Sequence, residues 1–378
     1  MTLSPSDVVF AEATPEQQRR AWELNGVSWA PPLSLPDYLE REKHLSQQEL
    51  ARDGGCKYWV LHLKSDPSTI VASCETTRKP VLIAGAPGEP VRRGVGYGIA
   101  SVYTDPAYRR QGMATLMLAK VQEFLDREAD CSALYSDIGR HYYGNLGWPA
   151  FPSDQATLHL EPPSPAEPGP DSGLQPFVPS DPPATRPLAR SDLPPLCAAD
   201  EALLESRLGA PLPAGGGGAG MARVAFVPSF AQISWQLARE DFMARKLFGV
   251  SVERRGAVTA DGKAWVVWDH DWREKKLKVM RLVATHDGGG EAGERIAALK
   301  ALLEAALAEA SAWGLQKVLV WNPDGEVTVA CKAVGNAHED SVKLVLDERL
   351  DGSIPSFRWR GEDKRDTIWE DNYYYCWC

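Results

Sequence analysis

The chain has 378 residues, 44% of them hydrophobic and 24% charged, which is typical of a folded globular protein with room for two ordinary domains. Its formal net charge of −10 argues against nucleic acid as the main partner, because phosphate backbones are held chiefly by lysine and arginine. We find neither a basic, apolar N-terminal leader nor a run of about 18 apolar residues, so we expect a cytoplasmic protein without a membrane span.

Helix-capping signals define the first elements. Residues 8–13 form a predicted strand, and the sequence Thr14-Pro15-Glu16-Gln17 is a capping box that predicts a helix to about Leu24. Ser34 repeats the start signal for a second helix, which we expect to reach Leu50 or Ala51.

Runs of β-branched and aromatic residues predict a sheet in the following segment. We expect a hairpin of strands at 57–63 and 69–76, a loop over 78–93 with a short strand at 81–84, and a further strand at 95–104. Apolar residues at helical spacing (Met117, Leu118, Val121, Phe124 and Leu125) follow, then a strand at 133–138 and a short helix within 139–147. The order predicts an α/β layout around one mixed sheet.

Proline and glycine mark a change of character after residue 152. Thirteen of the 29 prolines fall between Phe151 and Pro195, so we expect neither regular helix nor inner strand there, but a linker or an extended surface belt. Gly215 to Gly218 predict a second flexible loop. We therefore divide the chain into a domain at 1–152, a connection at 153–220 and an α/β domain at 221–378.

The C-terminal part repeats an order of elements seen earlier. We expect a helix at 230–248, capped by Ser229 and ended by Gly249, then strands at 263–268 and 276–285, a helix at 294–313 and a strand at 316–321. This strand, strand, helix, strand order suggests a second, degenerate copy of the first fold. Residues 285–293, however, lack a donor-rich loop with a Gln-Gly core.

A phosphate-binding loop is predicted within residues 94–114. A strand ends near Thr104, Pro106 breaks it, and Arg109-Arg110-Gln111-Gly112-Met113-Ala114 opens the next helix. A helix N-terminus has free N–H groups and the positive end of the helix dipole, and glycine lets an anion approach the backbone. We expect Arg109 and Arg110 to contact phosphate. The alternative is that both are solvated side chains of an exposed loop.

These residues, with Tyr142-Tyr143 and Leu146-Gly147-Trp148 downstream, resemble the Gcn5-related N-acetyltransferase (GNAT) superfamily over residues 8–152. The resemblance implies that backbone N–H groups between Arg110 and Thr115 hold the pyrophosphate of acetyl-CoA, and that Val102 and Tyr103 lie along its pantetheine arm. It also implies that Tyr143 protonates the departing thiolate. Ser136 stands where the superfamily often has Asn. The implied cofactor contacts are therefore Val102, Tyr103, Arg109, Arg110, Gln111, Gly112, Met113, Ala114 and Thr115.

A narrower resemblance covers most of the chain. The sequence is similar to the fungal lysine acetyltransferases of lysine catabolism, long two-part proteins that acetylate the side-chain amine of free lysine. The residues that carry this similarity are Ser73-Cys74-Glu75-Thr76, Gly98 to Thr104, Trp235, Arg239-Glu240, Ser353 to Ser356 and Trp369 to Cys378.

Amine acetylation needs a base for the amine and an acid for the thiolate. Tyr143 suits the acid role, although it is also a plausible core aromatic. Glu75, in an otherwise apolar strand, is our first candidate for the base and for attracting the amine, with an outward-facing residue as the alternative. Asp137 is the second candidate, or a simple N-cap, and His141 a third.

The cysteines are not assigned to the chemistry. Cys74 adjoins Glu75, but no His–Cys pair supports an acetyl-cysteine intermediate, so we expect direct transfer in a ternary complex. The seven cysteines lack paired metal-ligand spacing and are odd in number, which favours reduced thiols and no metal. Cys376 and Cys378 form the alternative, a pair that could bind a soft metal.

The last ten residues are unusually aromatic. Five aromatics among residues 369–378, against 9% in the whole chain, predict that this tail docks, as the last strand of the second domain or over the cleft. In the second case Glu370 or Asp371 could bind the amine.

The sequence as a whole predicts an acetyl-CoA-dependent N-acetyltransferase, a monomer or homodimer, with a small-molecule amine such as lysine as acceptor. The alternatives are an enzyme acting on a secondary metabolite or a protein amine, and an acyl-CoA-binding scaffold or sensor without turnover. Loss of Tyr143 and Glu75 would matter to an enzyme and not to a scaffold.

Overall fold

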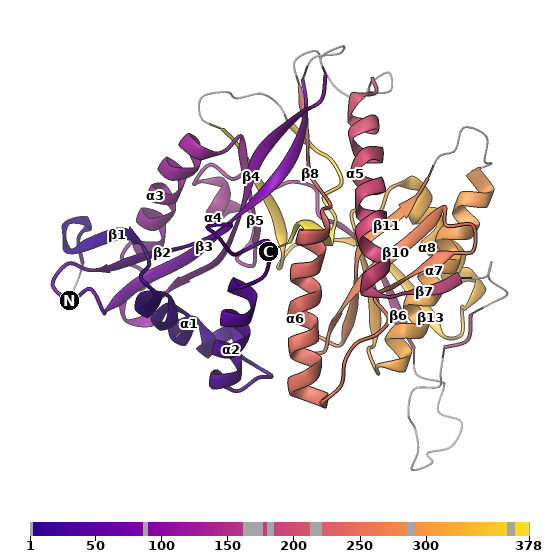
Figure 1. Ribbon diagram of the computed structural model, residues 1–378, viewed down its shortest axis with the longest axis horizontal. Coiled ribbons are helices and arrows are strands. Elements are labelled where there is room, and N and C mark those ends of the chain that lie inside the picture. Colours follow the sequence, from indigo (N-terminus) through magenta and orange to yellow (C-terminus); the bar gives the residue numbers. More distant parts are fainter. Residues whose placement is uncertain are drawn as a thin grey trace.

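Two mixed sheets organise the chain. The computed structural model describes residues 3–85, 90–161, 177–179, 185–211, 221–285, 292–360 and 367–377. Figure 1 shows the first sheet with its helices on the left, the second on the right, and one long helix, α6 (Phe230–Phe248), between them. Within the described ranges, no helix is both long and apolar enough to cross a membrane.

The first sheet takes strands from both ends of the chain. Its spatial order is β1 (Val8–Glu12), β2 (Cys56–Leu63), β3 (Ile70–Ala84), β4 (Arg92–Thr104), β5 (Cys131–Ser136) and β14 (Ile354–Trp359), while β8 (Ala222–Phe226) pairs with β3 and β15 (Thr367–Trp369) pairs with β8. Most neighbours are antiparallel, but β4 and β5 are parallel. The predicted mixed sheet is confirmed.

The second sheet has the spatial order β13 (Val342–Glu348), β6 (Asp154–Leu160), β12 (Lys317–Trp321), β11 (Lys276–Ala284), β10 (Ala264–Asp271), β9 (Gly256–Thr259) and β7 (Thr185–Leu188). Antiparallel β10 and β11, a helix, and then β12 parallel to β11 repeat the order of β3, β4, a helix and β5. This is the repeat that the sequence suggested.

Helices cover these sheets. The remaining ones are α1 (Pro15–Trp29), α2 (Leu35–Ser46), α3 (Met113–Glu128), α4 (His141–Gly144), α5 (Leu193–Gly209), α7 (Ala292–Ala312) and α8 (Gly325–Ala337), with 3₁₀ turns η1 (Pro5–Asp7), η2 (Pro106–Tyr108), η3 (Arg190–Asp192) and η4 (Tyr374–Cys376). The apolar face predicted for α3 is confirmed, because Met117, Leu118, Val121 and Leu125 are buried in the first core. α7 buries Leu299, Leu302, Leu303 and Leu307 against the second sheet.

Caps explain which helix ends the sequence predicts well. Thr14 and Gln17 form the predicted capping box, and α6 has the predicted limits because Ser229 accepts from the Gln232 N–H and Gly249 adopts φ 70°. Without such signals, α1 continues past Leu24 to Trp29, and α2 ends at Ser46, before the predicted Leu50 or Ala51.

The predicted loop over 78–93 is wrong at its start, because β3 continues through Pro80 to Ala84, while the short strand predicted at 81–84 is confirmed as the end of β3. The strand pairs with β2 up to Thr77 and with β8 from Val81 onward. Pro80 lies between the two partners, where a residue without an N–H loses no bond to either.

The expectation that residues 151–195 hold no regular helix or inner strand is also wrong. β6 lies between β13 and β12, and its own residues contain no proline. Prolines also occupy places that tolerate them, namely edge strand β7 and the first turn of α5. Residues 162–176 and 212–220, which include the predicted Gly215 to Gly218 loop, lie outside the described residues, and the three-part division itself stays a prediction.

The aromatic tail docks, as predicted, but not as a strand of the second sheet. β15 joins the first sheet through β8, and Trp369, Tyr374, Tyr375 and Cys376 are buried in a core that both halves share. Cys378, one member of the proposed metal pair, lies outside the described residues.

Candidate active site

The parallel strands β4 and β5 of the first sheet separate toward their C-terminal ends. Their pairing ends at Ile99 and Leu134, while β4 continues to Thr104. A bulge opposite Cys74, with Ser101 at φ 54°, turns β4 at this point. Beyond the bulge no described strand pairs with the β5 side of β4, so the backbone around Val102 and Tyr103 can pair with a ligand.

The loop after β4 ends in a helix N-terminus without a side-chain cap. Gly112 adopts φ 76°, in the left-handed region, and has no heavy atom within 4 Å of the place where a Cβ would lie. The first helical bond runs from the Leu116 N–H to the Gly112 carbonyl at 2.9 Å. The N–H groups of residues 113–115 therefore have no acceptor among the described residues, and face an open surface suited to an anion.

Side chains of this loop mostly stabilise its shape. Arg109 donates from Nε to the Thr104 carbonyl at 3.0 Å and lies over the Tyr103 ring, and Gln111 accepts from the Leu3 N–H at 2.7 Å. Met113 is buried in the core. The Met113 side chain is thus unavailable to a ligand, and the Gln111 side-chain oxygen is already engaged.

Two further loop side chains are exposed. Arg110 adopts φ 59° and has no hydrogen bond or ion pair among the described residues, so its guanidinium is free to meet a phosphate. Thr115 is exposed on the first turn of α3, beside Ala114, with its hydroxyl 3.4 Å from that of Tyr142.

Tyr143 lies in the first core, on α4. Burial raises the pKa of its phenol above the usual value, with Cys74 and Asp137 adding to the effect, so the hydroxyl remains a donor at neutral pH. Ser136, whose place resembles that of an Asn, donates to the Gly139 carbonyl at 2.7 Å and accepts from the Ile138 N–H at 3.2 Å. It shapes the turn into α4.

The structure gives different surroundings to the three other residues considered for the chemistry, Cys74, His141 and Asp137. Cys74 is buried, and burial raises the pKa of its thiol, so no thiolate forms at neutral pH. His141 is exposed on α4. Asp137 does not cap α4; it accepts from the Ser353 N–H at 2.8 Å and lines the cavity between the two halves.

A cavity of about 560 Å³ lies between the halves. The first half contributes β3, β4 and α2, the second contributes α6, β10 and β11, and the tail contributes Tyr374 and Trp377. Glu75 lines it from β3, beside the bulge of β4. The cavity therefore joins the open part of β4 to a chamber built by both halves.

The Glu75 carboxyl has an unusual acidity. Burial, reinforced by the charge of Glu42, raises its pKa to about 8, against the opposing effects of Ser101, Trp22 and Arg41. Its pKa thus lies close to neutrality, where a carboxylate can both take and release a proton.

The sequence did not predict a role for two cavity residues on α2, Arg41 and Glu42. Arg41 donates to Glu42 Oε1 from Nε at 2.9 Å and from Nη2 at 2.7 Å, and both line the cavity. The only signal was an Arg-Glu pair within a predicted helix, and nothing in the sequence says which face of that helix meets the other half.

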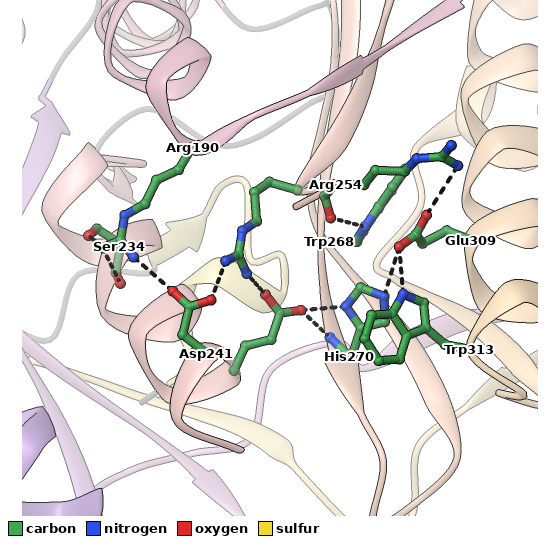
Figure 2. A network of polar contacts seen from close by, with 10 residues as sticks. Arg190, Ser234, Asp241, Arg254, Trp268, His270, Glu309 and Trp313 are labelled. Atoms are coloured by element: carbon green, nitrogen blue, oxygen red, sulfur yellow. Dashed lines mark hydrogen bonds and ion pairs between the residues drawn. The ribbon is translucent and has the colours of Figure 1, made fainter. Parts of the chain in front are cut away.

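A buried network fixes the wall from the second half (Figure 2). Glu240 on α6 accepts from the His270 N–H at 2.8 Å, lies 2.5 Å from Nδ1 of the same ring, and pairs with Arg255. Glu309 on α7 lies 3.3 Å from His270 Nε2. Burial alone would lower the pKa of His270, but the two carboxylates raise it to about 9, so the ring is charged at neutral pH.

This network positions α6, whose residues Trp235 and Arg239 line the cavity. The tail is held in a similar way, since the Trp377 carbonyl accepts from Gln236 Nε2 at 2.7 Å and the Cys376 carbonyl from buried Lys79 at 2.8 Å. Hydrogen bonds and ion pairs therefore anchor this side of the wall.

Glu370 and Asp371, the tail residues predicted as candidates for binding the amine, do not line the cavity. Glu370 pairs with Arg223, and Asp371 pairs with Arg207 at 2.6 Å and Arg281 at 2.7 Å. Carboxylates already neutralised by arginine have no free charge for a ligand. The tail reaches the cavity with Tyr374 and Trp377 instead.

Comparison with known families identifies both halves. Residues 21–148 match the Acetyltransferase (GNAT) family, and residues 172–378 match the LYC1 GNAT-like C-terminal domain. The predicted GNAT fold and the second, GNAT-like α/β domain are thus confirmed. Uncharacterized protein YGR111W of Saccharomyces cerevisiae is 24% identical over 425 aligned positions that cover all of both chains. It carries no described activity, so the narrower resemblance to lysine acetyltransferases stays a prediction.

Solved structures share the two-part fold. A probable N-acyltransferase from Enterococcus faecalis has a TM-score of 0.53 and 11% identity, over 93% of this chain and 72% of its own. A GCN5-related N-acetyltransferase from Kribbella flavida has a TM-score of 0.51 and 17% identity, over the same shares. A tandem GNAT protein from the clavulanic acid biosynthesis pathway has a TM-score of 0.50 and 12% identity, over 95% of this chain and 100% of its own.

Proposed function

We propose that this chain, which belongs to the family of the LYC1 GNAT-like C-terminal domain and has a GNAT fold in its N-terminal half, is an N-acetyltransferase that transfers acetyl from acetyl-CoA to a small primary amine. One observation carries the proposal. The open edge of β4 leads directly to the uncapped N-terminus of α3 at Gly112, so one ligand can meet strand and helix together.

The residues present fit acetyl-CoA in chemical terms. The free N–H groups of residues 113–115 and the exposed Arg110 are donors for a pyrophosphate, and the unpaired edge at Val102 and Tyr103 offers backbone groups to the amides of pantetheine. When bound, acetyl-CoA supplies the acetyl thioester.

The chain's own residues supply the proton transfers. An amine is protonated at neutral pH, and Glu75, with its pKa near 8, can take the proton that the amine must lose before its nitrogen bonds to the acetyl carbon. As the carbon–sulfur bond breaks, Tyr143 can donate its proton to the thiolate, because burial keeps the phenol protonated. Asp137 is the second candidate for the base.

The acceptor in this proposal is a small molecule. A cavity of about 560 Å³ walled by both halves suits a ligand of that size, since it can exclude water and fix orientation. We favour lysine or a lysine-like amine, on the resemblance described for the sequence.

Incubation of the protein with acetyl-CoA and a panel of free amines, with mass detection of products, tests this function. The panel contains L-lysine, ornithine, cadaverine, an aminoglycoside and a lysine peptide. Acetylation of a free amine would support the proposal. A product formed only on the peptide would move the function to protein acetylation, and acetyl-CoA binding without any product would support the scaffold alternative.

A further inference from the structure

The cavity is lined by two arginines that form no ion pair with a described residue. Four of the six lysines and arginines that line it have one within 3.8 Å among the described residues, namely Arg41 with Glu42, Arg273 with Glu274, Lys276 with Asp271 and Lys278 with Asp269. The other two are Arg239 and Arg349, which form no ion pair with any described residue.

Arg349, which follows β13, is the more confined of the two. Its Nε and Nη2 atoms are buried and have no hydrogen-bond partner in the described part of the chain, and its guanidinium carbon lies 3.9 Å from the centre of the Trp321 ring. Burial lowers the pKa of Arg349 to about 10, so the group is still charged at neutral pH. A buried, charged donor without an acceptor is costly unless a ligand provides one.

Arg239 extends from α6 into the same cavity. Its guanidinium lies 5.9 Å from the centre of the Trp377 ring, and no described residue accepts a hydrogen bond from it. The helix that carries it is anchored at the neighbouring Glu240, which the buried network ties to Arg255 and His270. A guanidinium beside an aromatic ring can take a carboxylate in a two-pronged geometry.

The unpaired carboxyl groups of the cavity come from the other half of the chain. Among its lining acids, Glu75 and Asp137 form no ion pair with a described residue, and both belong to the first half. Arg239 and Arg349 both belong to the second. The cavity therefore presents unpaired carboxyl groups from one half and unpaired guanidinium groups from the other, which complements a ligand with an amine at one end and a carboxylate at the other.

We infer that Arg239 and Arg349 form a carboxylate-binding subsite, so that the acceptor is an amino acid held by its carboxylate with its distal amine toward Glu75. This inference rests on the proposed function, because it assigns the far end of the same acceptor. The two guanidinium groups then fix the acceptor's orientation and select against amines that lack an acid group.

Steady-state kinetics with L-lysine and cadaverine test the subsite, because cadaverine is lysine without its carboxylate. At saturating acetyl-CoA, Arg239→Gln and Arg349→Gln should each raise KM for L-lysine roughly ten- to hundredfold, the range for a charged hydrogen bond. KM for cadaverine and for acetyl-CoA should stay unchanged. Arg239→Lys should restore part of the lysine affinity. Arg245→Gln, an exposed change on the same helix, is the matched control.

Three results would overturn the subsite: equal wild-type efficiency with both amines, equal losses with both amines in the variants, or no effect of either arginine. Melting curves first establish that each variant folds. Where a glutamine variant does not fold, the charge-retaining lysine variant at the same position is measured instead. If the protein acetylates no amine at all, the proposed function fails separately, and calorimetry decides the subsite. L-Lysine binding that is weakened by Arg239→Gln would support it, and absence of L-lysine binding would refute it.

Discussion

The two halves use the same order of strands and helix for different purposes. In the first, β4 and β5 separate after Ile99 and leave an open edge beside an uncapped helix. In the second, β11 and β12 pair only at Lys276 to Lys278, and the tail packs where they separate, with the Tyr374 ring 4.5 Å from that of Trp321. One opening can receive a ligand, whereas the other is filled by the chain itself.

The two halves also differ in how their buried charges are paired. In the second half, several buried charges are paired internally, as in the Lys278–Asp269 pair at 2.6 Å and the contacts of His270 with Glu240 and Glu309, although Arg239 and Arg349 have no ion pair with a described residue. In the first half, Glu75 lines the cavity without a cation partner among the described residues. Paired charges stabilise a wall, while an unpaired one is available for chemistry.

The largest expected effect concerns the open loop. Gly112→Asp places a negative charge and a strained side chain where phosphate should bind, and should weaken acetyl-CoA binding by about 10³-fold in calorimetry, since several charged hydrogen bonds are lost together. Gly249→Asp is the control from the second half, because Gly249 has a similar φ of 70° at the end of α6. Equal losses in both variants would mean that Gly112 matters only for folding.

Tyr143→Phe tests whether the acid belongs to the first half. Loss of the hydroxyl should reduce kcat by roughly 10²-fold with the KM for acetyl-CoA nearly unchanged, because the proton is needed only as the thiolate departs. Tyr142→Phe, one residue away, should keep normal turnover. Wild-type kinetics in Tyr143→Phe would remove the phenol from the mechanism.

The charged His270 makes the second half sensitive to alkali. Its folded pKa of about 9 exceeds the ordinary 6.5, so its stabilisation is complete below pH 6.5 and is lost as pH rises through 9. The free energy of unfolding should fall by at most about 3 kcal/mol over that window. Urea titrations at pH 6, 8 and 10 measure it. In His270→Gln the stability should already be lower at pH 6 and this component of the slope should vanish; an unchanged slope would contradict a charged ring.

The smallest effect is a displacement of the pH–rate profile. If Glu75 acts as the base, kcat/KM for the acceptor should rise with pH up to about 8 and then level, and Glu75→Gln should remove this rise. Glu42→Gln removes the neighbouring negative charge and should move the inflection to lower pH by on the order of one unit. Glu40→Gln, exposed on the same helix, should not. If neither Glu42→Gln nor Glu75→Gln moves the inflection, the base is Asp137 or water instead of Glu75.

Local signals account for what the sequence predicted well. Ser229 and Gly249 bound α6 on both sides, and the loop before α3 could be located because strand, break, glycine and helix follow one another. Aromatic density also predicted that the tail is buried. Each of these depends on residues close together in the chain.

Long-range packing accounts for the rest. The pairing of β14 with β5, and of the tail with β8, joins segments that no local pattern relates. Three cavity side chains take their places only when the two halves meet, namely Glu42, Arg239 and Arg349. The sequence therefore cannot show which of them form ion pairs. The ion-pair partners of Glu370 and Asp371 could not be predicted for the same reason, because Arg207, Arg223 and Arg281 are distant in the chain.

The strand exchange between the halves has a consequence for biosynthesis. On the ribosome, β5 emerges with one edge unpaired, and its partner β14 follows only with Ile354 opposite Ser136. At 5–20 residues per second, that edge waits roughly ten to forty seconds. During this time the nascent sheet can pair with a foreign strand. Chaperones that shield edges are thus expected to matter more for this chain than its modest length suggests, and a message cut short before β14 would yield a protein with the loop before α3 but an unfinished sheet.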